Sequence, residues 1–353
     1  MGRVAVTGIG PVSPIGIGKE QFWSAVKNGL CGIIKSTRGA FPYDVYCGEI
    51  GGLPLTDYMN DKRFRRAADV SQYALIASNL AVNDAGHQAI DGSETALFMG
   101  ITHGALGYTQ KFHRALIDEG VDAISPIHFS DSVLNAPAGN VSICFGIKGP
   151  VHTLVGGPEV GIKSIAPACE MLRSGRSARS LVVSAEELNE LTLSCYARMG
   201  VSPLSEGAGA LLLEREEDIT SGRVPYCYIS STASRCNPSG RDAVAREVIA
   251  NCLEKAQLRI RDIDLFVTDQ NMPPGALPDD VAYGGIIPLT GNAFSVTTLW
   301  HVIAASLAIR NGTIPETFIT NEMRTPGRIN NVMVCASGQH VASAIILSGY
   351  AKT

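Results

Sequence analysis

The feature that most constrains the fold of this chain is a pair of apolar strands that occurs twice. Residues 180–184 (SLVVS) precede residues 207–213 (GAGALLL), and residues 331–335 (NVMVC) precede residues 341–347 (VASAIIL). In each pair an aliphatic strand is followed by a strand of aliphatic and small residues, a composition that suits sheets buried on both faces. The repetition predicts a duplicated α/β unit whose halves pack in layers.

Hydrophobic periodicity predicts alternating strands and helices in both halves. Strands are expected at 3–7, 95–100, 151–155, 180–184, 208–214, 225–232, 265–268, 331–335 and 341–347. Helices are expected at 19–29, 68–86, 105–119, 132–145, 159–174, 242–256 and 298–311. The opening strand should end at Thr7, because Gly8, Gly10 and Pro11 follow it and such residues favour turns. Pro167 predicts a kink or an early end in the helix around it.

We divide the chain into an N-terminal half, 1–217, and a C-terminal half, 218–353. No linker rich in Pro, Gly or Ser separates them, so the halves should share one core. Hydrophobic residues make up 45% of the 353 residues, which is enough for such a core.

Composition argues against several classes of protein. The chain has 29 basic and 33 acidic residues, and a formal net charge of −4 does not suit a nucleic-acid-binding surface. Its apolar runs fall short of the ~20 residues that a membrane span needs, and its start lacks a signal-peptide pattern, so we expect a cytoplasmic protein. The nine cysteines include no Cys-x-x-Cys pair, and the histidines show no metal-ligand spacing. We therefore expect neither disulfides nor a metal or other cofactor.

Three segments carry a resemblance to a known family. They are residues 6–16 (VTGIGPVSPIG), 135–150 (NAPAGNVSICFGIKGP) and 206–209 (EGAG). In this order and at this separation they resemble the β-ketoacyl-acyl-carrier-protein synthases, condensing enzymes of the thiolase fold. The resemblance covers nearly the whole chain and implies a thiolase-like, duplicated five-layered αβαβα core.

The resemblance also implies a catalytic centre, and this chain departs from the family pattern there. Such enzymes join an acyl chain to a malonyl unit with two histidines and a cysteine at a strand-to-helix turn, which we call the elbow. Aligned through Gly149, Pro150 and residues 161–165 (GIKSI), the cysteine position holds Pro158. Proline has no nucleophile, although it suits the first turn of a helix.

The histidine positions differ as well. The first corresponds to Gln270 in residues 265–272 (LFVTDQNM), and glutamine cannot shuttle a proton near neutral pH. The second lies in a Lys-Ser-x-Thr-Gly-His pattern, whose counterpart FSVTTL places Phe294 at the lysine and Leu299 at the histidine. His301 follows two residues later and, on a helix, should point away from the first site. The loop before residues 206–209 is trimmed to residues 200–205 (GVSPLS).

Loss of every catalytic position with retention of the fold motifs favours a non-catalytic subunit. The family contains such subunits, the chain length factors of type II polyketide synthases, which pair with an active ketosynthase and act on carrier-bound acyl chains. The resemblance therefore implies a heterodimer with an active ketosynthase and work on an acyl chain carried by an acyl carrier protein. With its trimmed loop the chain resembles the subunits of aryl polyene synthases more than those of aromatic polyketide synthases.

Family dimers pair the strand before the elbow, which here presents Val151, Thr153 and Val155. A partner's helix closes the acyl tunnel in such dimers. In this chain Tyr108, Phe112 and Leu116 form one stripe of the corresponding helix at i, i+4 and i+8, and we expect them to set the tunnel depth. Ordinary core or interface packing explains such a stripe equally well.

Two alternatives remain open from the sequence. One is an autonomous acyltransferase or thioesterase that uses Cys195, Cys335 or Ser337 as its nucleophile. The other is a homodimeric acyl-binding scaffold with no ketosynthase partner. The basic cluster 62–66 (KRFRR) is a candidate contact for an acidic carrier protein, although a solvated basic turn explains it more simply.

Overall fold

The computed structural model describes residues 2–39, 41–51, 53–59, 61–201, 203–268, 281–319 and 327–349, apart from the side chain of Ile127. Within these residues no helix is long and apolar enough to cross a membrane.

The two halves repeat one arrangement of five strands. In the N-terminal half the spatial order is β1 (Val4–Ser13), β9 (Gly207–Arg215), β7 (Arg179–Glu186), β5 (Thr95–Ile101) and β6 (Val151–Val155). In the C-terminal half it is β10 (Cys227–Cys236), β14 (Val341–Ser348), β13 (Asn331–Ser337), β11 (Leu265–Thr268) and β12 (Tyr283–Gly284). The pairing directions also agree between the halves. In each half the first three strands in this order pair antiparallel to their neighbours, and the last three pair parallel to theirs. The duplicated α/β unit predicted from the two strand pairs is therefore confirmed.

The halves join through β1 and β10. These strands pair in antiparallel register at Val4↔Ile229, Ala5↔Tyr228 and Val6↔Cys227. With β2 (Gly16–Ile17) at the end of β1, the described strands form one hydrogen-bonded network of 11 strands. A separate small sheet contains β3 (Ile33–Lys35), β4 (Tyr46–Gly48) and β8 (Leu204–Ser205).

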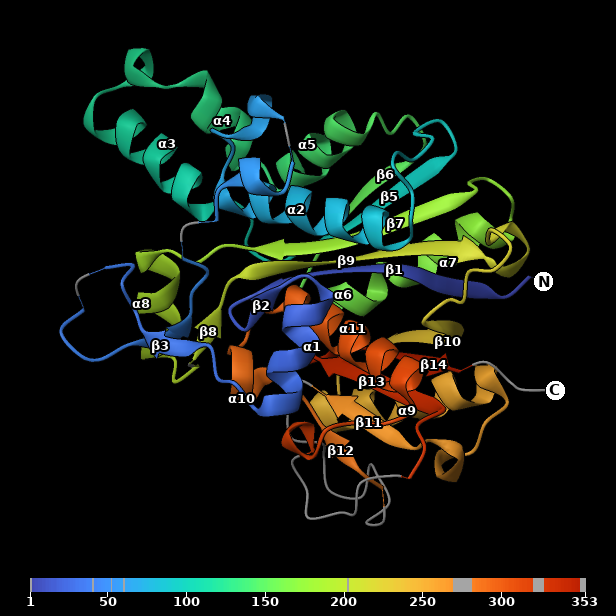
Figure 1. Cartoon of the computed structure of the whole chain (residues 1–353). Coiled ribbons are helices and arrows are strands. Elements are labelled where there is room, and N and C mark those ends of the chain that lie inside the picture. Colours follow the sequence, from blue (N-terminus) through green and yellow to red (C-terminus); the bar gives the residue numbers. More distant parts are fainter. Residues whose placement is uncertain are drawn as a thin grey trace.

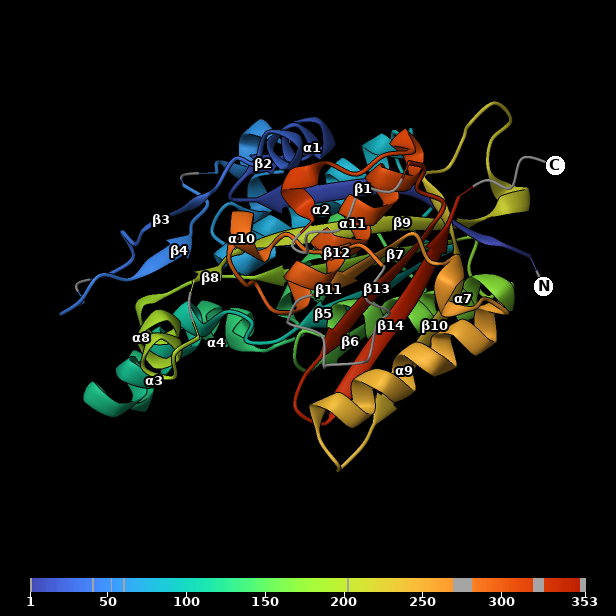
Figure 2. The same ribbon diagram turned by 90° about the horizontal axis from the view of Figure 1, so that it is seen from below.

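Helices form three layers around the two halves of the sheet (Figures 1 and 2). The outer face of the N-terminal half carries α2 (Asp69–Asp84) and α5 (Ala136–Phe145). Between the halves lie α6 (Val160–Lys163), α7 (Ile165–Arg173) and α11 (Ser295–Asn311). The outer face of the C-terminal half carries α9 (Arg241–Ala256). The five-layered αβαβα core is thus confirmed.

The remaining helices lie at the periphery. They are α1 (Lys19–Asn28), α3 (Leu106–Asp118), α4 (Pro126–Ser132), α8 (Glu190–Arg198) and α10 (Ile287–Thr290).

The prediction that the first strand ends at Thr7 is wrong, because β1 continues to Ser13. The glycines after Thr7 do not form a turn; they allow α2 to pack closely on the strand. A Cβ at Gly8 would overlap the carbonyl oxygen of Ala81, and one at Gly10 would overlap that of Ala77. Glycine is required here for the close approach of two backbones.

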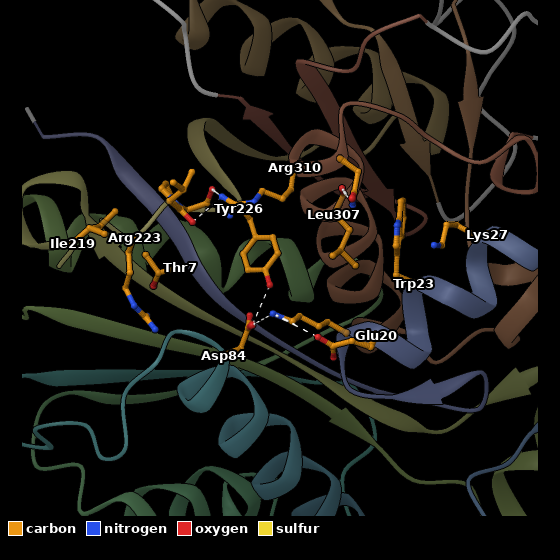
Figure 3. A pocket seen from close by; sticks show the side chains of 14 residues that line it. Thr7, Glu20, Trp23, Lys27, Asp84, Ile219, Arg223, Tyr226, Leu307 and Arg310 are labelled. Atoms are coloured by element: carbon orange, nitrogen blue, oxygen red, sulfur yellow. Dashed lines mark hydrogen bonds and ion pairs between the residues drawn. The ribbon is translucent and has the colours of Figure 1, made fainter. Parts of the chain in front are cut away.

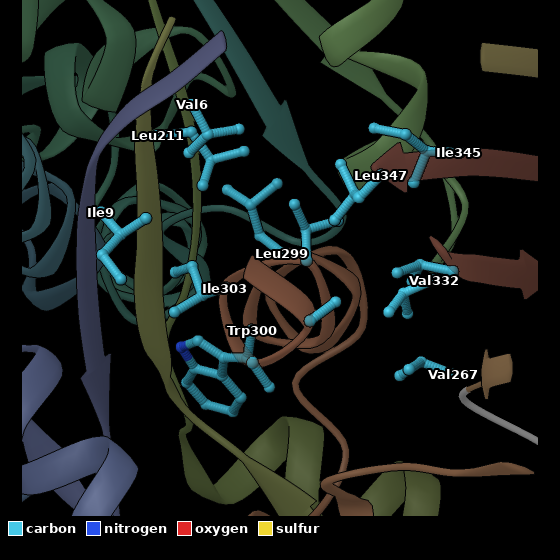
Figure 4. Close-up of a cluster of buried hydrophobic side chains, with 14 of the residues drawn as sticks. Val6, Ile9, Leu211, Val267, Leu299, Trp300, Ile303, Val332, Ile345 and Leu347 are labelled. Atoms are coloured by element: carbon cyan, nitrogen blue, oxygen red, sulfur yellow. The ribbon is translucent and has the colours of Figure 1, made fainter. Parts of the chain in front are cut away.

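Helix α11 occupies the centre of the molecule, between the two halves of the sheet (Figure 4). Leu299, Trp300 and Ile303 are fully buried among strand residues from both halves. The indole N–H of Trp300 donates to the carbonyl of Ala208 on β9 at 2.8 Å. The helix begins at Ser295 rather than near 298, because the hydroxyl of Thr297 accepts the N–H of Ala293 at 2.7 Å and supports the first turn.

Two other predicted helices have different bounds in the structure. The segment predicted as 159–174 forms α6 and α7, with a break at Ser164, and this confirms the kink or early end expected from Pro167. Proline has no N–H to donate to the carbonyl of Lys163, four residues earlier, so the first helix ends there. The segment predicted as 132–145 contains α5 alone, and α4 precedes it as a separate short helix.

Candidate functional site

The elbow, residues 156–159, follows β6, which lies at the edge of the sheet. β6 pairs only with β5 among the described strands, in parallel register from Leu97↔Val151 to Ile101↔Val155. Its other side is open, and the exposed fractions of Val151 and Val155 are 39% and 54%. Apolar side chains on an unpaired strand edge are a surface that proteins normally cover.

Pro158 lies at the turn between β6 and α6, in the position predicted for it. Its carbonyl accepts a hydrogen bond at 2.9 Å from the hydroxyl of Thr298, which belongs to α11. Thr298 takes the place of the glycine in the Lys-Ser-x-Thr-Gly-His pattern, so the hydroxyl that holds the elbow comes from a position that sequence reasoning did not single out. The same hydroxyl also lies 2.9 Å from the carbonyl of Ser295, one turn earlier in α11, so the two carbonyls share this donor.

Glu159 is the second residue of the elbow that sequence reasoning missed. It is 7% exposed, and its Oε1 accepts the N–H of Gly157 at 3.1 Å. A Cβ at Gly157 would lie 2.7 Å from Oε2, and one at Gly338, in the turn between β13 and β14, would lie 3.5 Å from it. Among the described residues Glu159 forms no ion pair, so a buried carboxylate fills the space beside Pro158. The acidic residue directly after Pro158 was the available sequence signal.

Leu299 and His301 point away from the elbow. Leu299 packs on β9, because its Cβ lies 3.1 Å from the position that a Cβ added at Gly209 would take. His301 is fully buried, and its Nε2 accepts the N–H of Ile286 at 3.0 Å. Burial lowers the pKa of His301 to about 3, so the ring is uncharged near neutral pH. Gln270 lies outside the described residues.

Phe294 occupies the lysine position within a small aromatic cluster. Its ring centroid is 4.6 Å from that of His103 and 5.0 Å from that of Tyr196. His103 Nε2 is 2.8 Å from the hydroxyl of Tyr196. The φ of Phe294 is 51°, a conformation that bulky residues rarely adopt, so the residue before α11 is held under strain.

Three buried glutamates fix the loops around this centre. Glu186 accepts N–H groups from Thr102 and His103 and the hydroxyl of Ser295. Glu206, in the motif at 206–209, is fully buried, accepts the N–H of Ile50 at 2.9 Å and that of Leu188 at 3.1 Å, and pairs with Arg38. Burial raises the pKa of Glu206, and the Arg38 charge opposes that shift.

The third, Glu187, joins two helices. Its carboxylate accepts the N–H of Gly107 in α3 at 2.9 Å and that of Val70 in α2 at 3.3 Å. Burial raises the pKa of Glu187 to about 7, and the two N–H groups oppose that change. Glu187 therefore links the first turn of α3 to the first turn of α2.

The stripe on α3 is half-buried rather than enclosed. The hydroxyl of Tyr108 donates to the carbonyl of Arg66 at 2.7 Å, and the ring of Phe112 lies 5.6 Å from that of Phe129 in α4. No residue of α3 from Leu106 to Asp118 is fully buried. The helix packs on α4 and leaves the rest of its surface at least partly exposed.

Exposed apolar side chains, together called the apolar band, lie on α3, α4, α5 and β6 and on the segments between these helices, and each of these elements packs against the next. Its members are Ile117, Val121, Phe129, Val133, Leu134, Ile143, Val151 and Val155. Thr153 and Leu116, between or beside them, are half-buried. Patches of this kind mark interaction sites on soluble proteins.

The alternative nucleophiles are scattered. Cys195 is exposed on α8, whereas Cys335 and Ser337 are buried on β13. All nine cysteines are free thiols. Among the described residues, no three His, Cys, Asp or Glu side chains come together in a way that could hold a metal ion.

Comparison with known proteins identifies the family. The family model for the "Beta-ketoacyl synthase, N-terminal domain" matches residues 1–219, and the chain belongs to this family. A 3-oxoacyl-[acyl-carrier-protein] synthase 2 of Staphylococcus aureus (strain N315) is 33% identical over 178 residues, which cover 49% of this chain and 43% of that protein. A protein of the same name from Vibrio harveyi is 28% identical over 196 residues, covering 52% and 46%. The chain thus aligns with less than half the length of these relatives.

Solved structures extend the similarity to the whole fold. The ishigamide ketosynthase/chain length factor superposes with a TM-score of 0.89 at 18% identity, covering 99% of both chains. A type II polyketide synthase complex of an acyl-carrier protein with its ketosynthase, AntDE:AntF, gives a TM-score of 0.84 at 19% identity, covering 99% of this chain and 100% of the other. The thiolase-like ketosynthase fold is therefore confirmed.

Proposed function

We propose that this chain is a catalytically inactive chain length factor. It pairs with an active β-ketoacyl synthase and shapes the acyl tunnel while a polyketide or polyene chain grows on an acyl carrier protein. Within this proposal the partner supplies the cysteine and histidines, and this chain supplies the other face of the interface.

The observation that carries the proposal is the composition of the elbow. Pro158 stands at the position of the nucleophile, Leu299 packs into the core, and His301 is neutral and engaged with Ile286. Glu159 adds a buried carboxylate beside Pro158, and it already accepts the N–H of Gly157, which is then not available to a thioester oxygen. Such an elbow supports binding and assembly rather than condensation.

The exposed apolar band supports the partner. It runs along the unpaired edge of β6 and over α3 to α5, the surface that family dimers use. The half-buried Phe112 and Leu116 lie within this region, so a partner seated on it would contact the stripe that we assign to the tunnel end. The similarity to a ketosynthase/chain length factor structure is consistent with this assignment.

The trimmed loop before residues 206–209 favours a polyene-forming system of the aryl polyene type over an aromatic one. A cytoplasmic location, where nine thiols stay reduced, is also part of the proposal.

The first test is assembly. The chain is co-expressed with a ketosynthase that has an intact Cys-His-His set, and native mass spectrometry measures the stoichiometry. We expect a one-to-one complex whose chain elongation requires both subunits. Val155→Asp on β6 should abolish the complex, whereas Val224→Asp, of similar exposure (61% against 54%) but distant from β6, should not. A stable homodimer that elongates or hydrolyses acyl thioesters alone would replace this proposal with one of the two alternatives.

The second test is product length. Phe112→Ala should lengthen the product, because it removes a ring at the expected end of the tunnel, whereas Arg114→Ala, an exposed position on the same helix outside the apolar band, should leave it unchanged. An unaltered product from the Phe112 variant in an intact complex would remove the tunnel assignment and leave Phe112 as a packing residue.

A further inference from the structure

A pocket of about 640 Å³ lies where the two halves meet, away from the elbow (Figure 3). Its walls come from α1, the end of α2, the connection before β10 and the end of α11. It is lined by Thr7, Lys19, Glu20, Trp23, Lys27, Asp84, Ile219, Arg223, Val224, Pro225, Tyr226, Leu307, Arg310 and Asn311. Its volume is within the range of small-molecule sites.

A buried ion pair fixes the base of this pocket. Asp84, at the end of α2, accepts hydrogen bonds from Lys19 of α1, from the hydroxyl of Tyr226 at 3.1 Å and from the N–H of Ile9 at 2.9 Å. Its side chain is 7% exposed. The three donors come from separate segments, so the walls are held in place without a ligand.

The other cations of the pocket have no acidic partner. Lys27, Arg223 and Arg310 form no ion pair with any described carboxylate, and the negative charge of Asp84 is already taken by Lys19. Glu20 adds one further carboxylate, which is 79% exposed and lies 3.8 Å from Lys19. The pocket therefore has an excess of positive charge although the whole chain is acidic.

One of these cations, Arg310, is held in place by hydrogen bonds. Arg310 donates through Nη1 to the carbonyls of Val224 at 2.8 Å and Pro225 at 3.0 Å, and its remaining donors stay available. The guanidinium of Arg223 lies against Gly86 after the end of α2, where a side chain would collide with it. Guanidinium groups favour phosphate, because their planar donors can bind two of its oxygens at once.

The pocket also has an apolar wall, formed by Trp23 and Leu307. Figure 3 shows Lys27 and Trp23 at one end and Arg223 at the other, with Tyr226 and Arg310 between them. Cations at both ends suit a ligand with more than one phosphate group, and the wall suits an apolar or ring-bearing part.

We propose that this pocket binds a small molecule that carries at least two phosphate groups, with its phosphates on Arg223, Arg310 and Lys27. A nucleotide and a coenzyme A-type pantetheine both have this chemistry. The site lies in this chain alone, so the proposal does not depend on a ketosynthase partner.

Isothermal titration calorimetry of the full chain at low salt tests the proposal, with ADP, coenzyme A, pyrophosphate and inorganic phosphate as separate titrants. We expect at least one of the first three to bind about tenfold more tightly than inorganic phosphate. ADP alone would indicate a nucleotide, coenzyme A alone a pantetheine ligand, and pyrophosphate as well would show that the charged groups suffice.

Variants locate the binding. Arg223→Gln and Lys27→Gln, both exposed, should each weaken it about tenfold, because each removes one charge-assisted contact. Arg246→Gln, an exposed arginine on α9, is the matched control and should have no effect. The proposal is overturned if none of the diphosphate compounds binds more tightly than inorganic phosphate, or if the pocket variants bind as well as the control.

Discussion

A cysteine placed at position 158 of the elbow should not by itself be a reactive thiol, because Glu159 lies beside it. The perturbation is Pro158→Cys, alone and combined with Glu159→Gln. Glutamine keeps an oxygen that can accept the N–H of Gly157, which Glu159 now accepts at 3.1 Å, and removes only the charge. The comparison therefore isolates the electrostatic effect.

The magnitude follows from the position of the carboxylate. A thiolate at ~5 Å from a carboxylate, in surroundings with an effective dielectric constant of ~20, meets a repulsion of about 3 kcal/mol, which corresponds to roughly two pKa units. The negative charge disfavours the thiolate, so the thiol pKa should be higher in the single variant than in the double variant. Since thiolate is the reactive form, alkylation near pH 7.5 should be at least about tenfold slower in the single variant.

The assay is the rate of iodoacetamide alkylation as a function of pH. Peptide mass spectrometry separates position 158 from the exposed thiols of Cys31, Cys195 and Cys236, which serve as internal controls. Equal rates and equal pH midpoints in the two variants would refute the reasoning. This readout needs no partner and no turnover, so it stays separate from the assembly test.

Two further predictions concern the scaffold. Gly10→Ala should destabilise the protein by about 3 kcal/mol or prevent folding, because its Cβ would overlap the Ala77 carbonyl, and denaturant unfolding measures this. Burial raises the pKa of Glu187 in the folded state from its ordinary value of about 4.5 to about 7, so the native state holds an extra proton between these pH values and its stability falls as pH rises from about 4.5 to about 7. Relative to the Glu187→Gln variant, the free energy of unfolding of the parent protein should fall by up to about 3 kcal/mol over that pH interval and stay constant above it. Parallel curves of stability against pH for the two proteins would contradict this.

Most of the strands could be predicted from the sequence, because strands buried on both faces are continuous aliphatic runs whatever their partners. The repetition of two such pairs was enough to predict the layers. The extent of β1 was not predictable from local signals. Gly8 and Gly10 resemble turn residues until the backbone of α2 is placed against them, and that contact joins segments about seventy residues apart.

The candidate site, like the fold, was predictable from the sequence only in part. The motifs on both sides of Pro158 predict that it takes the nucleophile position, and this assignment stays a prediction. The contacts of Thr298 and Glu159 could not be predicted, since the first depends on how α11 crosses the elbow and the second on a side chain that turns back on its own loop. Glu206 lies in a quoted motif, but the loop contacts of the three glutamates were missed because most of their partners are backbone N–H groups, which leave no trace in a pattern of side chains.

The short pairing between β1 and β10, together with the burial of α11 against both halves, bears on how the protein unfolds. Neither half can lose its structure without exposing one face of α11 to water. We therefore expect the slowest-exchanging amides of β9 and β14 to open with the same free energy, as parts of one cooperative unit. Two polypeptides produced separately by cutting the chain near residue 217 would then be poorly folded alone, and mixing them should restore the core.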